Sequence, residues 1–313
     1  MNAIRVIPLF LLLLVLEGCV SKAKQTDLWF ASSHDIKSEH QVPQVPFIEQ
    51  SAGHCGPATM AMAMQWAGQP VNVETLAREI YDPQMKGSLQ TDLIRVGRQH
   101  GMMAVVIEGL PTLLSEIQSG HPVLVFENLA LRWLPQWHYA LVFGYDLREQ
   151  VVVMHSGPEA FKHWDMRKFE RSWMLGDYWG LVVLPPGEVA TAAGEIANLT
   201  AAAGLEQIGQ AQAAEKSYRR ILETWPGSLG SLIGLGNLAF LKKQPQVAVD
   251  YLQQAVQAHP EAPVAWHNLA IAQGAAGMKE AAMRSAKRAV QLAPVAAKSM
   301  YLTDLKEWTR ALN

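Results

Sequence analysis

Three prolines in the last third of the chain, Pro226, Pro260 and Pro294, are spaced 34 residues apart. Small residues repeat at the same spacing in two further triplets, which are Ala214, Ala248 and Ala282, and Ala202, Gly236 and Ala270. A unit of this length holds two helices and their turns, and small side chains let the paired helices approach closely. Because one such unit cannot bury its apolar face alone, the pattern predicts a stack of helix pairs.

The period resembles that of the tetratricopeptide repeat. The resemblance implies an all-α solenoid over residues 195–312, with repeats at about 195–228, 229–262 and 263–296 and a C-terminal capping helix. The alternative is a plain helical bundle, which requires the regular spacing to be accidental.

A solenoid of helix pairs presents a concave groove lined by the first helix of each pair. Here that lining includes the polar residues Asn237, His267 and Asn268, so we expect the repeats to bind a protein partner. The alternative is that the array serves as a spacer packed on the rest of the chain.

The remaining sequence is long enough for a second domain. The chain has 313 residues, and its composition changes abruptly after the segment Leu184-Pro185-Pro186-Gly187, as at a domain boundary. The 26 Lys and Arg residues against 28 Asp and Glu residues leave a formal net charge of −2 and no basic field, which argues against nucleic-acid binding. The two cysteines, Cys19 and Cys55, exclude a cysteine-based zinc ribbon and allow at most one disulfide.

The first 18 residues are typical of an export signal, because Arg5 precedes an apolar run over residues 6–16 that is too short to span a membrane comfortably. The segment Leu16-Glu17-Gly18-Cys19 then resembles a bacterial lipobox, although Glu17 is an atypical occupant of its position. The resemblance implies a signal peptide over residues 1–18 and a lipid on Cys19 that holds the protein to a membrane. The alternatives are plain signal cleavage nearby or an uncleaved anchor.

Val20 stands where an Asp would resemble the signal for retention at the inner membrane, so the resemblance favours the outer membrane, facing the periplasm. Residues 21–46 are polar, with Pro43 and Pro46 near their end, and we predict a tether over residues 19–46 that lifts the globular part off the bilayer.

Residues 47–187 have the pattern of a mixed α/β domain. Helices are predicted at 58–67, 73–81, 89–100 and 110–118, and strands at 102–108, 121–127, 138–145, 150–155 and 180–184. A short helix is also predicted within residues 161–173. The clustered strands with short polar turns favour an antiparallel sheet packed against the first helices.

The segment from Gln50 to Trp66 carries the candidate chemistry. Pro57 suits the first position of a helix, which places Cys55 at the helix N-terminus, where unpaired N–H groups favour a thiolate and lower the thiol pKa. The amide of Gln50 can turn back toward the sulfur and, with the backbone N–H of Cys55, hold an oxyanion. The alternative is a cysteine that is an ordinary packed residue.

The order Gln-x-x-x-x-Cys-Gly-Pro-Ala from Gln50 to Ala58, followed by a helix of small residues, resembles the nucleophile segment of C39-like peptidases. These form the bacteriocin-leader-processing branch of the papain-like cysteine peptidases. The resemblance implies an α+β papain-like C39 peptidase domain over residues 47–187, followed by the all-α tetratricopeptide solenoid. It implies no metal or organic cofactor.

A thiol nucleophile needs a base within hydrogen-bond reach. His138 is the best candidate, because it opens the strand His-Tyr-Ala-Leu-Val-Phe-Gly-Tyr-Asp, which resembles the histidine strand of the family. The family carries an Asp at the end of the next strand, whereas the corresponding segment here, from Val153 to Pro158, has no carboxylate. Either His155 or Ser156 can orient the imidazole instead. Alternatively neither touches it, and activity is weakened or lost.

These residues predict a membrane-anchored, exported cysteine peptidase that hydrolyses a peptide bond in a peptide or protein substrate. One alternative is a non-catalytic protein that keeps the peptidase fold as a docking scaffold. Another is an amidase or acyl transferase that acts on a small molecule or a cell-wall peptide.

Overall fold

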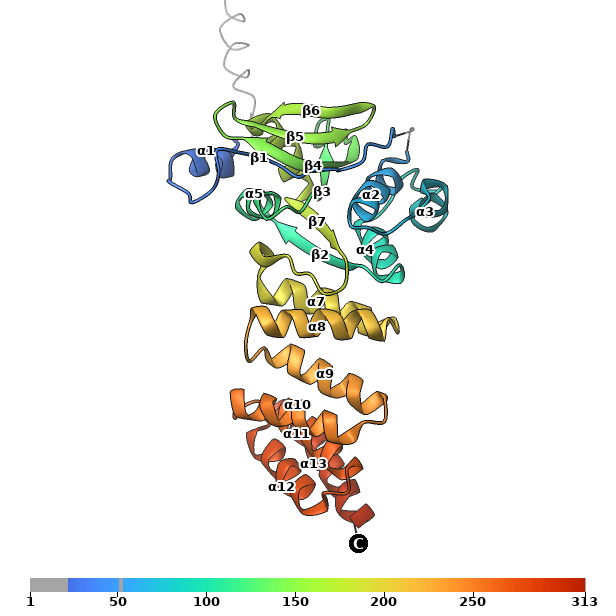
Figure 1. Ribbon diagram of the computed structural model, residues 1–313, viewed down its shortest axis with the longest axis vertical. Helices are drawn as coiled ribbons and strands as arrows, with labels where there is room; N and C mark the ends of the chain where they lie inside the picture. Colours follow the sequence, from blue (N-terminus) through green and yellow to red (C-terminus); the bar gives the residue numbers. More distant parts are fainter. Residues whose placement is uncertain (1–21, 51–52, 313) are drawn as a thin grey trace, which may run out of the picture.

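The computed structural model of the protein describes residues 22–50 and 53–312. Figure 1 shows an α+β unit built on a twisted sheet, with a stack of helices extending from one end of it. Within the described residues, no helix is both long and apolar enough to cross a membrane. The expected signal peptide and Cys19 lie outside the described residues.

The α+β unit has helices before, within and after its sheet. Its helices are α1 (Lys24–Phe30), α2 (Cys55–Trp66), α3 (Val73–Ile80), α4 (Gln90–Gln99), α5 (Leu110–Gln118), α6 (Met166–Trp173) and the 3₁₀ turns η1 (Met174–Gly176) and η2 (Thr191–Ala193). Its strands are β1 (Glu39–Gln41), β2 (Met103–Glu108), β3 (Val123–Asn128), β4 (Trp137–Asp146), β5 (Val151–Ser156), β6 (Glu159–Asp165) and β7 (Trp179–Leu184).

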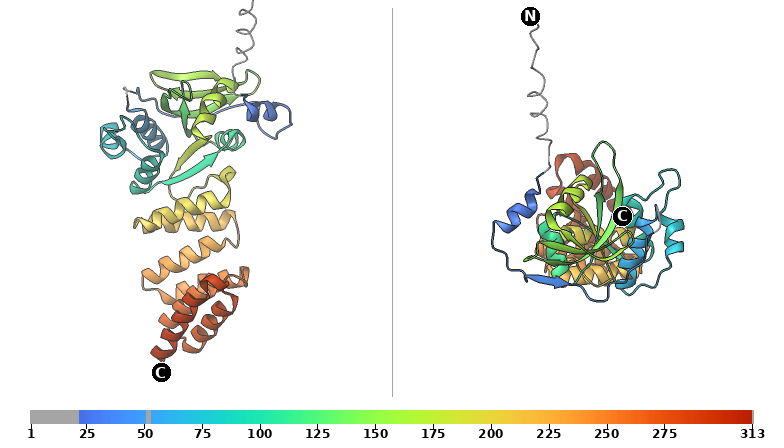
Figure 2. Two further views of the ribbon diagram at one scale, coloured as in Figure 1. Left: turned by 180° about the vertical axis from the view of Figure 1, so that it is seen from behind. Right: turned by 90° about the horizontal axis from the view of Figure 1, so that it is seen from above.

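The strands form a single sheet of order β2-β7-β3-β4-β5-β6, with β1 added to the far end of β4. Each of these pairings is antiparallel, as the sequence predicted. Strand β4 is buried from Tyr139 to Tyr145, because both faces of the sheet are covered. Helices α2, α3 and α4 lie on one side of the unit and α1 lies on the other, in the front and rear views alike (Figures 1 and 2).

The predicted tether at residues 19–46 is wrong for the part that the structure describes. Residues Lys24–Phe30 form α1, and the buried carboxylate of Glu170 on α6 accepts hydrogen bonds from the backbone N–H of Gln25 at 2.9 Å and of Thr26 at 2.7 Å. Farther along, β1 pairs with β4 and Val42 is buried in the core. The segment is polar in sequence, but its partner Glu170 lies about 144 positions away, which no local pattern reveals.

Strand β6 was not predicted either. Its residues, from Glu159 to Asp165, are exposed or half-buried along the whole strand, because β6 is the edge of the sheet. Without a buried face it lacks the apolar alternation by which strands are recognised.

The C-terminal helices form pairs with the predicted period. They are α7 (Gly194–Gln207), α8 (Ala211–Thr224), α9 (Leu229–Leu241), α10 (Pro245–Ala258), α11 (Pro263–Ala275), α12 (Lys279–Leu292) and α13 (Val295–Leu312). The second helices of the pairs begin at 211, 245 and 279, which are 34 residues apart. Small residues are required between them, because a Cβ atom at Gly236 would lie 2.6 Å from the side chain of Leu252. The solenoid prediction is therefore confirmed.

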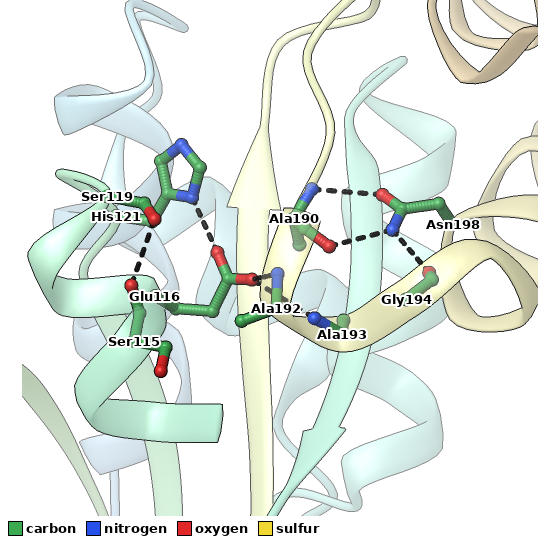
Figure 3. A network of polar contacts seen from close by, with 9 residues as sticks. All are labelled: Ser115, Glu116, Ser119, His121, Ala190, Ala192, Ala193, Gly194 and Asn198. Atoms are coloured by element: carbon green, nitrogen blue, oxygen red, sulfur yellow. Dashed lines mark hydrogen bonds and ion pairs between the residues drawn. The ribbon is translucent and has the colours of Figure 1, made fainter. Parts of the chain in front are cut away.

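A buried polar network joins the array to the sheet unit (Figure 3). The carboxylate of Glu116 on α5 is fully buried; it accepts hydrogen bonds from the backbone N–H of Ala192 at 2.7 Å and of Ala193 at 3.2 Å, and it contacts Nδ1 of His121 at 2.7 Å. Thus the turn η2, which leads into the array, is held by a side chain of the sheet unit.

Asn198 on α7 fixes the same turn from the other side. Its Oδ1 accepts from the N–H of Ala190 at 2.9 Å, and its Nδ2 donates to the carbonyls of Ala190 and Gly194, each at 2.8 Å. Helix α7 also packs against β2, and Ala202 and Leu205 belong to the same apolar core as the sheet. The array begins near the predicted boundary, but the core continues across it.

Candidate active site

Cys55 is the first residue of α2, so the structure places it at a helix N-terminus. The helix begins two residues before Pro57, whereas the sequence predicted Pro57 as the first helical residue. Helix α2 is buried on nearly every side, and the side chains of Met60 and Met64 are inaccessible to solvent. This packing fixes the position of the half-buried thiol.

The thiol does not have the lowered pKa that its helix position predicted. Burial raises the pKa of Cys55 above its usual value, while hydrogen bonding from the backbone at Tyr139, Gly56 and Cys55 itself acts in the opposite direction. Desolvation of the thiolate is the larger effect here, because the whole helix end is packed into the domain. Cys55 is therefore a thiol at neutral pH and needs a base to become a nucleophile.

His138, on β4, is the residue next to Tyr139, whose backbone contacts the sulfur. Its Nε2 lies 3.0 Å from the Oγ of Ser156 on β5. This contact engages one of the two ring nitrogens, so a proton transfer from the thiol would use the other, Nδ1. Burial, with a smaller effect from the charge of Lys162, lowers the pKa of His138 to about 4. The imidazole is therefore neutral at pH 7 and can accept a proton.

Of the two candidates for the third residue, Ser156 contacts His138 and His155 does not. In the β4–β5 register His155 lies opposite Leu141, so Ser156 is on the other face of the sheet, the face that carries His138. The ring of His155 lies 4.4 Å from that of Phe143, and its Nδ1 accepts from the N–H of Phe161 at 3.2 Å. His155 is thus a buried core residue.

Gln50 is held by contacts at both ends of its amide. Its Nε2 donates to the Oγ1 of Thr59 at 3.1 Å, and its Oε1 accepts from the N–H of Gly157 at 3.2 Å. The hydroxyl of Thr59 in turn donates to the carbonyl of Tyr139 at 3.3 Å. An amide nitrogen carries two hydrogens, so the second one is available for an oxyanion.

Gln50, Cys55 and His138 line one cavity of about 730 Å³. Its wall also contains the aromatic residues Phe126, Trp137 and Tyr139, together with Gly53, Met85, Lys86, Gly87, Ser88, Leu89, Gln90, Gln136 and Gly157. The three predicted residues thus converge on a space that admits a ligand, with aromatic surface beside them.

Two further histidines, His54 and His100, do not line this cavity. The ring of His54 stacks on Tyr81 with centroids 4.8 Å apart, and His100 bonds to Glu79 at 2.8 Å. Within residues 22–50 and 53–312, no three His, Cys, Asp or Glu side chains are arranged to hold a metal ion.

Two residues of the site were missed in the sequence. Thr59 orients Gln50, and its position four residues after Cys55 on the same helix face would have been a usable indication. The backbone of Gly157 also holds Gln50, but this contact spans 107 residues and has no sequence pattern.

The model of the Peptidase_C39 like family matches residues 42–177, which include Cys55, His138 and Ser156. No curated protein matches the chain.

Among solved structures, a putative C39-like peptidase from Bacillus anthracis is 18% identical, and the match covers 47% of this chain and 97% of that one with a TM-score of 0.39. A double glycine motif protease from an AMS/PCAT transporter, in complex with the leader peptide, is also 18% identical, with 46% and 93% covered and a TM-score of 0.37. The first tetratricopeptide domain of Spaghetti (RPAP3), bound to an HSP90 peptide, is 18% identical over 38% of this chain and 92% of that one, with a TM-score of 0.35.

The family match covers the part of the chain that holds the thiol, the imidazole and strands β2 to β6, and helix pairs with a 34-residue period follow it. The chain thus joins a region that matches the Peptidase_C39 like family over residues 42–177 to a tetratricopeptide-type helical array.

Proposed function

We propose that the protein is a cysteine peptidase that hydrolyses a peptide bond by means of Cys55 and His138. The observation that carries this proposal is the convergence of Gln50, Cys55 and His138 on one cavity, with the imidazole fixed by Ser156. The family match supports the same reading, because its residues span the whole site.

In the proposed reaction His138 takes the proton of the Cys55 thiol as the sulfur attacks the substrate carbonyl. The backbone N–H of Cys55 and the Nε2 of Gln50 then stabilise the oxyanion. The imidazolium protonates the departing amine, and water hydrolyses the thioester with His138 again acting as base. Because the thiol pKa is raised and the imidazole pKa is lowered, the resting pair is neutral, and proton transfer accompanies attack.

We further propose that the repeats bind a protein partner. A groove of about 300 Å³ runs over the first helices of the pairs, where the Nδ2 of Asn268 donates to the Oδ1 of Asn237 at 3.1 Å. Both residues were expected in the groove. His267 was expected there too, but its ring packs on Tyr301 of α13, with centroids 5.2 Å apart.

We also propose that Cys19 carries lipid and holds the protein at the bacterial outer membrane, facing the periplasm. Because α1 begins at Lys24 and its N-terminal turn is bound to Glu170, only residues 20–23 of the sequence separate Cys19 from a docked helix. A lipid at Cys19 would therefore seat the peptidase domain against the bilayer and not on a long tether.

The experiment is a cleavage assay with a mixture of peptides, read by mass spectrometry as newly formed N-termini. The full-length protein should cleave a subset of the mixture, and Cys55→Ala should cleave none while unfolding at nearly the same temperature. Equal cleavage by Cys55→Ala would show that the activity does not use this thiol. Cleavage by neither protein, with intact folding and a reactive thiol, would point to the amidase or docking alternatives.

A further inference from the structure

Glu127 on β3 is a buried carboxylate that the proposed mechanism does not use. Its side chain is inaccessible to solvent. One oxygen, Oε2, accepts from the Oγ of Ser172 on α6 at 2.7 Å, whereas Oε1 has no hydrogen-bond partner among the described residues. A buried carboxyl oxygen without a partner costs free energy, so its retention calls for a reason.

The β3–β4 register places Glu127 directly opposite His138. Directly opposite residues of an antiparallel pair project from the same face of the sheet, with Cβ atoms about 5 Å apart. Ser156, which fixes the imidazole, belongs to that face as well. His138 is therefore flanked by a serine on β5 and by a carboxyl group on β3.

We propose that Glu127 is the positioning residue that supplies the negative charge for the imidazolium of His138. Glu127 lies on β3, whereas the family carries its Asp on the strand that follows the histidine strand, which is β5 here. This inference rests on the proposed function, because it concerns the same thiol and imidazole. Ser156 sets the ring angle, and Glu127 supplies the charge that a serine cannot.

The ionisation of Glu127 is compatible with that role. Burial raises the pKa of Glu127 to about 7, and the hydroxyl of Ser172 and the charge of Lys162 oppose the rise. The carboxyl group thus changes charge near neutral pH. When it is ionised, it favours a positive charge on His138; when it is protonated, it does not.

Other charged groups near β3 have different partners. The strand packs against α2, α5, α6, η1, β4 and β7. The ionisable side chains on these elements are Cys55, Glu116, Arg167, Lys168, Glu170, Arg171, His138, Tyr139, Tyr145 and Asp146. Glu116 is bound to η2, Glu170 to α1, and the hydroxyl of Tyr139 to the carbonyl of Ser88. Among these groups His138 is the one in register with Glu127, and Lys162 on β6 is the cation that acts on both.

The test is the rate of alkylation of Cys55 by iodoacetamide between pH 5 and 10 in the full-length protein, read by peptide mapping so that Cys19 does not contribute. In the wild type the rate should rise through the region of pH 7 as Glu127 ionises. In Glu127→Gln that rise should be lost, and the rate at pH 8 should fall roughly 10- to 50-fold, as for the loss of a unit charge at this separation.

The matched control is Glu170→Gln, the same change at another fully buried carboxylate, whose partners are α1 and Tyr178. It should keep the wild-type pH profile even if stability falls. Lys162→Gln is a second variant, at a partly exposed residue. The charge of Lys162 lowers the pKa of Glu127, so its loss should move the rise in alkylation rate to higher pH.

The outcomes separate this inference from the proposed function. If His138→Ala slows alkylation but Glu127→Gln keeps the wild-type profile, Glu127 is a structural residue and the inference is wrong. If His138→Ala also leaves the rate unchanged, the thiol and imidazole do not act together, and the proposed function fails first. An unchanged profile in Lys162→Gln would likewise contradict the role of Glu127.

Discussion

Replacing Ser156 by alanine removes the 3.0 Å contact that fixes the His138 imidazole. A hydrogen bond of this kind contributes about 1 kcal/mol net, which corresponds to a five- to tenfold change in a rate that depends on the ring orientation. Ser156 is 4% exposed, so water has little room to replace the hydroxyl. We therefore expect the rate of Cys55 alkylation at pH 8 to fall five- to tenfold.

The same change should have a small effect on folding, because one hydrogen bond of about 1 kcal/mol shifts the unfolding temperature of a protein of this size by about 2–4 °C. Ser217→Ala is the matched control. Ser217 is also fully buried, and its hydroxyl donates to a backbone carbonyl at 2.8 Å, but it lies on α8 in the array. It should lose a similar amount of stability and none of the thiol reactivity. Wild-type reactivity in Ser156→Ala, with slowed reactivity in His138→Ala, would refute the orienting role of Ser156.

Three further perturbations test other parts of the account. Glu116→Ala should destabilise the protein by about 3 kcal/mol, because it leaves two buried N–H groups and His121 without their acceptor. Calorimetry should still show one unfolding transition if the core is continuous. Separate transitions, with the first at the wild-type temperature, would contradict the shared core. Because the pKa of Glu127 is raised to about 7, the folded protein keeps a proton on this carboxyl group between about pH 4.5 and 7, where the unfolded chain loses it. Wild-type stability should therefore fall relative to Glu127→Gln by up to about 3 kcal/mol as the pH rises through that window. A stability difference between the two proteins that is the same at all pH values would exclude the raised pKa of Glu127. Cys19→Ser should move the protein from the membrane fraction to the soluble or unprocessed pool, as measured by fractionation, and continued membrane association after signal cleavage would place the anchor elsewhere.

The parts of the fold that sequence predicted are those whose interactions are local or periodic. The 34-residue spacing predicted the helix pairs, and apolar runs predicted most strands of the sheet. The docked segment with α1 and β1 was misread as a tether, because its stability comes from Glu170 and β4, far along the chain. Edge strand β6 lacks the alternation that a buried face imposes.

The predictions for the site likewise depended on local sequence motifs. Cys55, Gln50 and His138 were predicted from two segments that resemble those of a known family, and the structure brings the three residues to one cavity. The choice between His155 and Ser156 depends on which face of β5 each occupies, and this follows from the register with β4. The thiol pKa was misjudged because the helix-terminus effect is local, whereas burial depends on the packing of the whole domain.

The central claim is that His138 activates Cys55. Its most direct test is labelling of the purified full-length protein with a thiol-directed acyl probe, with the adduct located by mass spectrometry. We expect acylation at Cys55 in the wild type and a rate lower by about 100-fold or more in His138→Ala, the usual contribution of a general base. Labelling of Cys55 at the same rate in both proteins would contradict the role of His138.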